Sequence, residues 1–297
     1  MPWLIFAIAA PFLYGISNFL DKFLVEKKIK DPLFLTIIGG TAMFLTGLLI
    51  LLLRGLEPLG LISAAVLLAG GALSQIFLLP YYKAIALDDI SRISPIFQVI
   101  PVLVFVFSYV LLGETLSLKQ FTGFILILAG GIIVSIEKAS KGIFKIRKAF
   151  WWALLASFLM SLPLVLFKFA AADINFWDAI VYNCGGIFLG TLILLIFGLD
   201  GFWSRIKRID AQTWYILAAN ECIYYAGLLC ATYAAYLGPV SLVAVLNGFL
   251  PGFVLIFGYI LSIYFPQIIK EDISKDAIAL KLVSIVLMIG GLWIINT

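Results

Sequence analysis

Long runs without any charged residue restrict what this chain can fold into. The sequence has no Asp, Glu, Lys or Arg at positions 32–53, 58–82, 93–113 or 179–199. A helix of roughly 20 residues crosses a ~30 Å hydrocarbon core. Only 12% of the residues are charged and 64% are hydrophobic, whereas a soluble domain is roughly a quarter charged. Most of the surface of the folded protein must therefore face lipid.

The runs predict an all-α integral membrane protein with ten transmembrane helices. The longest run, from Cys222 to Ile269, exceeds one crossing, and Gly238-Pro239 marks a break within it. No basic residue precedes the first apolar stretch, so it does not resemble a cleavable signal. The ten spans are expected near 3–22, 33–53, 61–82, 93–112, 118–136, 150–170, 177–198, 213–236, 240–264 and 279–295.

The basic residues predict the orientation of these spans. Arg54, Lys119 and Lys168 fall in loops on the side of the two termini, and all other basic residues fall on the opposite side. The positive-inside rule places the basic side in the cytoplasm. We therefore predict a multi-pass protein of the cell (inner) membrane with extracytoplasmic N- and C-termini. Basic runs in short loops are explained by topology or by lipid headgroups, so no nucleic-acid partner is expected.

Sequence elements recur in the same order in the two halves of the chain. Phe12-Leu13, Lys22-Phe23 and Gly39-Gly40 recur 146 positions later; Ala84, Ser91, Pro101, Val104, Phe107 and Tyr109 recur 150 positions later; and Gly130-Gly131 recurs 160 positions later. The predicted repeats are residues 1–140, with helices 1–5, and residues 146–297, with helices 6–10. Because five is odd, the second repeat enters the membrane inverted, as in many transporters.

The segment YYKAIALDDISRISPIFQVIPVLVFVFSYVLLGETLSLKQFTGFILILAGGIIV, residues 81–134, resembles the second half of an EamA domain. The resemblance lies in the short link to Ser91, in Pro101, in the helix end Leu112-Gly113-Glu114 and in Gly130-Gly131. The second copy has Ser262-Ile263-Tyr264 where the first has Leu-Gly-Glu. Nearly the whole chain is similar to two EamA repeats of the drug/metabolite transporter superfamily.

That resemblance implies a ten-helix carrier with its substrate site at the repeat interface. It leaves the substrate open, since family members carry amino acids, sugar phosphates, nucleotide sugars, choline or drugs. Many ten-helix members are expected to keep both termini in the cytoplasm, whereas the charges of this chain predict the reverse.

One carboxylate, Glu221, lies deep in a predicted span, about 12 Å from the helix start at 1.5 Å per residue. An ionisable group at mid-bilayer costs about 2.5–3.5 kcal/mol on insertion scales, so it requires compensation. Tyr224 and Tyr225, three and four residues later, lie near it on the helix. These residues either line a solute cavity, or Glu221 is a structural acid that is protonated or paired with Lys22 or Lys83.

The other candidate substrate-binding residues are polar side chains of the remaining spans. Gln75 is the counterpart of Tyr225 at the offset of 150, so it offers a polar group at a matching height. The candidates on other spans are Gln98, Asn247, Tyr14 and Asn18.

Two prolines and two lysines are candidates for hinges or gates. Pro101 and Pro251 free backbone carbonyls one turn earlier for a solute or water, or they only kink their helices. Lys22 and Lys168 lie near helix ends, where they either snorkel to the membrane surface or act as gates.

The function predicted from these features is secondary-active transport of a small polar metabolite, such as an amino acid or amine, by alternating access. The sequence has no histidine and no GxxxxGK[ST] motif, so we expect neither an enzyme nor an ATP-driven pump. No cofactor or metal is expected, and a proton is a candidate coupling ion. The expected partners are a small-molecule substrate and the lipid bilayer. The alternatives are a sugar, nucleotide-sugar or drug carrier, a channel or scaffold, and a lipid-modifying enzyme.

Overall fold

The computed structural model describes residues 1–29, 31–87, 94–137, 148–198, 202–250, 252–254, 256–257 and 275–296. These residues form helices joined by short links, and no strand occurs among them. Five helices are close to single predicted spans: α1 (Pro2–Phe23), α2 (Pro32–Arg54), α7 (Leu118–Glu137), α8 (Lys148–Ala171) and α9 (Phe176–Gly198). The helix α11 (Ala211–Leu237) and the helix α14 (Lys275–Asn296) are each longer than predicted.

Three predicted spans are divided into shorter pieces. The third consists of α3 (Leu61–Ile76) and α4 (Leu78–Leu87), the fourth of the 3-10 helix η2 (Ser94–Val99) and α6 (Ile100–Leu112), and the ninth begins with α12 (Val240–Leu246) and the 3-10 helix η3 (Asn247–Phe249). Two further elements were not predicted: the π-helix η1 (Leu24–Lys28) and the short α10 (Phe202–Ile206).

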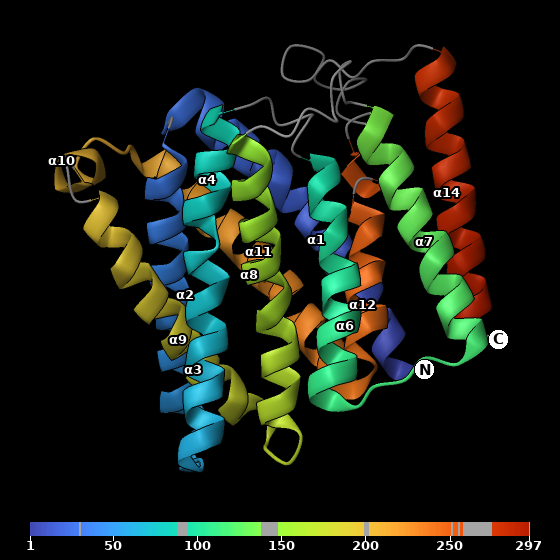
Figure 1. The fold of residues 1–297 in the computed structure, drawn as a ribbon. Helices are drawn as coiled ribbons and strands as arrows, with labels where there is room; N and C mark the ends of the chain where they lie inside the picture. Colours follow the sequence, from blue (N-terminus) through green and yellow to red (C-terminus); the bar gives the residue numbers. More distant parts are fainter. Residues whose placement is uncertain are drawn as a thin grey trace.

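The helices run up and down in one bundle, and both termini lie at the same end of it (Figure 1). We call this the terminal end, and we call the opposite end, where α10 lies, the far end. The pairs of long helices that pack against each other include α3 and α9, α1 and α11, α7 and α14, and α2 and α9.

Five stretches are long and apolar enough to cross a membrane: Pro2–Asp21, Pro32–Arg54, Leu61–Ala84, Lys148–Ala171 and Phe176–Gly198. Shorter apolar helices accompany them. The 27-residue α11 is not among the five, because polar side chains interrupt its apolar sequence. The helix with the deep carboxylate is thus the least lipid-like of the long helices.

Glycines permit the close approach of α3 and α9. A Cβ added to Gly71 would lie 2.2 Å from the carbonyl oxygen of Asn183, and one added to Gly186 would lie 2.1 Å from that of Leu68. Both distances are too short for non-bonded atoms, so any larger residue would force the two backbones apart. Gly71, which precedes Glu221 by 150 positions, therefore lies in a helix contact.

Candidate functional site

Glu221 lies ten residues into α11, which corresponds to about 15 Å of helix. The helix begins at the far end with Asp210 as its N-cap, whose carboxylate accepts a hydrogen bond from the backbone N of Thr213 at 2.9 Å. Hydrogen bonds from the side chain and backbone of Thr213 lower the pKa of Asp210. The helix start is thus firmly fixed, and Glu221 is deeper than the sequence predicted.

The carboxylate of Glu221 faces a glycine of α2. A Cβ added to Gly39 would lie 3.0 and 3.1 Å from its two oxygens. The hydroxyl of Tyr225, one turn further along α11, donates to the carbonyl oxygen of Gly39. The absence of a side chain at Gly39 therefore gives the carboxylate and the tyrosine access to α2.

A second carboxylate, Asp21 of α1, lies close enough to Glu221 for the two charges to repel each other. Asn220 holds it in place: the amide Nδ2 donates to Asp21 Oδ1 at 2.7 Å, and the amide Oδ1 accepts from Ser17 Oγ at 2.8 Å. The side chain of Asn220 is only 2% exposed. The sequence did not predict this contact, because Asp21 lies near a helix end, where a charged residue is usual.

No described lysine or arginine forms an ion pair with Asp21 or Glu221. Lys83, one predicted partner of Glu221, instead places its ammonium over the ring of Trp152, 4.5 Å from the ring centroid. The side chain of Lys22, the other predicted partner, lies outside the described residues. The described part of the chain thus contains two neighbouring acids without a cation.

Lys168 takes part in a polar contact at the terminal end. Its Nζ lies 3.0 Å from Glu114 Oε1 and also donates to the carbonyl oxygen of Gly238. The carboxylate of Glu114 accepts from the backbone N of Val240 at 3.0 Å and from Ser241 Oγ at 3.2 Å. We call these residues the clasp. It joins the α6–α7 link to α8 and to the break between α11 and α12, so Lys168 is paired rather than snorkelling.

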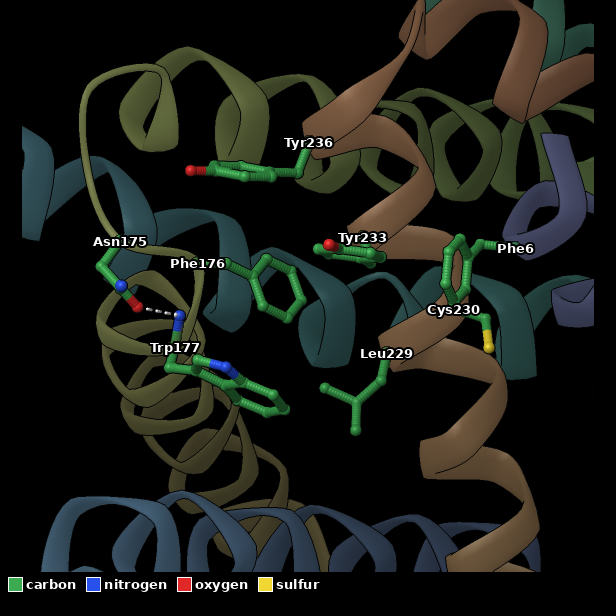
Figure 2. Close-up of a pocket in the computed structure, with 8 residues that line it drawn as sticks. All are labelled: Phe6, Asn175, Phe176, Trp177, Leu229, Cys230, Tyr233 and Tyr236. Atoms are coloured by element: carbon green, nitrogen blue, oxygen red, sulfur yellow. Dashed lines mark hydrogen bonds between the residues drawn. The ribbon is translucent and has the colours of Figure 1, made fainter. Parts of the chain in front are cut away.

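A cavity of about 460 Å³ also lies beside residues 229–236, in the last turns of α11. Aromatic side chains form most of its wall, and Figure 2 shows how they surround the space. Its lining residues come from α1, from the α8–α9 link, from α9 and from α11: Phe6, Asn175, Phe176, Trp177, Leu229, Cys230, Tyr233 and Tyr236. None of these residues was among the predicted substrate-binding residues, although the recurrence of tyrosines on the helix of Glu221 was a usable signal.

A ridge of side chains on α11 connects the surroundings of Glu221 with the aromatic cavity. Glu221, Tyr225, Leu229 and Tyr233 follow one another at four-residue spacing, so each side chain lies near the next on the helix surface. Leu229 is about 12 Å along the axis from Glu221 and Tyr233 about 18 Å. The same helix therefore carries the acid and one wall of the cavity.

Residues 1–136 match the sequence model of the EamA-like transporter family. This part of the chain is an EamA-type domain of the drug/metabolite transporter superfamily. This match confirms the resemblance seen in residues 81–134, and the chain is a multi-pass membrane protein.

A solved structure described as a crystal structure of a protein aligns with a TM-score of 0.71 at 16% identity. The alignment covers 99% of this chain and 96% of that one, and at such identity it concerns the fold alone. No curated protein sequence matches the chain.

Among the other predicted site residues, Tyr224 follows Glu221 by one helical turn, and Tyr14 packs against Tyr224. The rings of Tyr14 and Tyr224 are 5.4 Å apart, and Tyr224 also contacts Tyr225 with ring centroids 6.0 Å apart. Tyr14 packs against Gly227, where an added Cβ would lie 2.8 Å from its ring. Asn18 of the same helix is exposed. Tyr224 and Tyr225 thus lie on the turn of α11 after Glu221, and Tyr14 extends this aromatic group towards Gly227.

The amides predicted to bind substrate are dispersed. Gln75 lies between α2, α3 and α9, where its Nε2 is 3.2 Å from the position of a Cβ on Gly40. The side chain of Gln98 points to α7, with Oε1 2.9 Å from the position of a Cβ on Gly131. Oε1 of Gln75 and Oδ1 of Asn247 are buried without a hydrogen-bond partner in the described residues. Gln75 thus lies against α2 and Gln98 against α7.

Pro101 lies in the first turn of α6, just after η2, and not in the middle of a helix. Proline is tolerated there, because the first-turn N–H has no intrahelical partner. Pro251 lies outside the described residues. The 3-10 helices η2 and η3 include Phe97 and Asn247, which are 150 residues apart, the same offset at which several residues of the sequence recur. Short 3-10 segments within longer helices often mark hinges.

Proposed function

We propose that the protein is a secondary carrier that moves a small polar metabolite with a cationic amine by alternating access. The observation that carries this proposal is the carboxylate of Glu221, which lies deep in α11 against Gly39 and beside Asp21 without a cationic partner in the described residues. An acid in this position without a cation requires a transferable partner, which is either the amine of a solute or a coupling proton. The neighbouring tyrosines supply aromatic faces and hydroxyls for the remainder of the solute.

The proposed architecture has ten crossings in two inverted repeats, residues 1–140 and 146–297. The common order of the recurring residues supports the repeats, and so do the 3-10 helices at equivalent positions. In such carriers the repeats rock about a central site. The ridge from Glu221 to Tyr233 is the proposed surface along which the solute moves, and the hinges are proposed at η2 and η3.

Counterflow in proteoliposomes tests whether the protein is a carrier. Vesicles are loaded with an unlabelled compound and diluted into the same compound in labelled form, across a panel of amino acids, primary amines and methylated amines. A carrier accumulates the label transiently above its equilibrium level, because exchange is coupled to binding at one site. Simple equilibration at channel-like rates, or no flux for any compound of the panel, would contradict the proposal.

The orientation proposed from the basic loops places the terminal end outside the inner membrane. In a variant without its three native cysteines, an impermeant thiol reagent applied to intact cells should label Ser117→Cys, in the α6–α7 link. It should not label Lys207→Cys, near α10, until the membrane is permeabilised. Both positions are exposed, so accessibility is matched. The reverse pattern of labelling would place both termini in the cytoplasm.

A further inference from the structure

We infer that one corner of the far end binds the phosphate of an anionic phospholipid. This basic corner consists of η1, α10 and the link from α10 to α11, and the two residues assigned to the phosphate are Lys27 and Arg208. The inference does not depend on which solute is transported. The proposed orientation would place the bound lipid in the cytoplasmic leaflet.

The basic corner lies at the height of the lipid headgroups. The apolar stretch Pro2–Asp21 ends three residues before η1 begins, and the apolar stretch Phe176–Gly198 ends four residues before α10 begins. The headgroup layer is roughly 5–8 Å thick on each side of a bilayer, so segments this close to the end of a crossing lie within or beside it. Figure 1 shows α10 at the outer edge of the bundle. The corner can therefore meet lipid directly.

Apolar packing and an ion pair hold α10 against the start of α2. Phe202 is 7% exposed, and the centroid of its ring lies 5.1 Å from that of Phe34. The guanidinium of Arg205 donates to the carboxylate of Asp31, which is the N-cap of α2. The corner is thus a fixed surface, as selective binding of one headgroup requires.

A second ion pair joins the segments that carry Lys27 and Arg208. Lys28 Nζ of η1 lies 3.6 Å from Asp210 Oδ2, just before α11. Lys27 precedes Lys28, and Arg208 precedes Asp210 by two residues. Both side chains are exposed, and neither forms an ion pair with an acid among the described residues. Two cationic groups without an anion are therefore brought to the same corner.

Exposed aromatic side chains accompany these cations and indicate the kind of anion. Trp203 of α10 is 68% exposed, and Trp214 and Tyr215, near the start of α11, are 37% and 78% exposed. Tryptophan and tyrosine are enriched at the headgroup level of membrane proteins, and basic residues there attract anionic lipid. A phospholipid offers both a phosphate and apolar chains, whereas a soluble polyanion would leave the rings in water. The combination favours a lipid.

Lys27 and Arg208 suit a phosphate in different ways. The guanidinium of Arg208 can donate two parallel hydrogen bonds to phosphate oxygens, and the ammonium of Lys27 provides a compact charge. Because the two residues belong to η1 and to the α10–α11 link, one phosphate held by both would bridge segments that are far apart in the chain.

Native mass spectrometry of delipidated protein in detergent tests the choice of lipid. The probes are phosphatidylglycerol, which is anionic, and phosphatidylcholine with the same acyl chains, which has no net charge. A basic residue at the membrane surface contributes about fivefold to the affinity for anionic lipid, so we expect phosphatidylglycerol to bind about twentyfold more tightly. Equal affinity for the two lipids overturns the inference. Displacement of phosphatidylglycerol by millimolar inorganic phosphate would overturn it as well, since the ligand would then be a free anion.

Paired substitutions locate the binding. Lys27→Gln with Arg208→Gln should weaken phosphatidylglycerol about twentyfold and leave phosphatidylcholine unchanged, whereas Lys27→Arg with Arg208→Lys keeps both charges and should stay within about threefold. The matched control is Arg54→Gln with Lys148→Gln, which removes two exposed basic residues outside the corner. Unchanged affinity in the first pair, or an equal loss in the control, refutes binding at this corner. If the first pair does not fold, the comparison of lipids on the unchanged protein still decides the ligand class.

These measurements contain no solute, so they are separate from transport. Selective binding of phosphatidylglycerol without counterflow of any compound would contradict the proposed function and leave the lipid site in place. Counterflow that depends on Glu221, without a preference between the two lipids, would do the opposite.

Discussion

Replacing Glu221 with glutamine is expected to reduce counterflow by about tenfold to a hundredfold without loss of the fold. Glutamine has nearly the same shape but can neither carry the negative charge nor release a proton. A charged hydrogen bond contributes about 1.5–3 kcal/mol, which corresponds to roughly a tenfold to hundredfold change in binding of a cationic solute. Initial rates of counterflow in proteoliposomes with matched protein content provide the measurement.

The thermal stability of the same variant separates a functional acid from a structural one. Glu221 has no cationic partner among the described residues, and Asp21 repels it, so an uncharged side chain removes an unfavourable charge from the interior. The Tm of Glu221→Gln in detergent is therefore expected to equal or exceed that of the unchanged protein. Glu57→Gln, at an exposed acid in the α2–α3 link, is the control. Normal flux together with a Tm several degrees lower would make Glu221 a structural carboxylate.

The extent of the long helices could be predicted because bilayer thickness controls it. The boundaries of α2, α8 and α9 each lie within two residues of the predicted spans, since an apolar run ends where charge begins. The divided spans were less predictable. The turn at Phe77 and the 3-10 helix η2 change the hydrogen-bond pattern of a helix without changing its hydropathy. Hydropathy therefore indicates where a chain crosses the membrane and not how regular the helix is.

The candidate site was only partly visible in the sequence. Glu221 was identifiable because a lone acid in an apolar run is costly, and its neighbours Tyr224 and Tyr225 followed from helical spacing. Asp21 was not, since its role depends on Asn220 of a helix far away in the chain. The same limit applies to Lys168, whose partner Glu114 appeared only as part of a helix-end motif. Contacts between distant helices depend on packing, which periodicity in one segment does not reveal.

Replacing either Glu114 or Lys168 breaks the clasp, and we expect either replacement to destabilise the protein. Glu114 and Lys168 have side chains that are 14% and 25% exposed, so each would be left largely buried and unpaired without the other. Truncating one partner of such a pair costs more than an exposed pair contributes, and we expect about 1–3 kcal/mol for Lys168→Met. That cost corresponds to a Tm lowered by roughly 5 °C.

A double-mutant cycle isolates the interaction. Glu114→Gln keeps an oxygen for the backbone N of Val240 and removes the charge, so the combination with Lys168→Met leaves no unpaired ion. The double variant should therefore be about as stable as Glu114→Gln alone, with a coupling free energy of about 1 kcal/mol or more. Lys207→Met, at an exposed lysine, should leave the Tm unchanged. If Lys168 only snorkels to the membrane surface, Lys168→Met will match this control and the cycle will show no coupling.

A measured coupling would instead mean that an acid from the first half of the chain fixes the α11–α12 break of the second half. Any movement of the two halves at the terminal end would then have to separate Glu114 from Lys168.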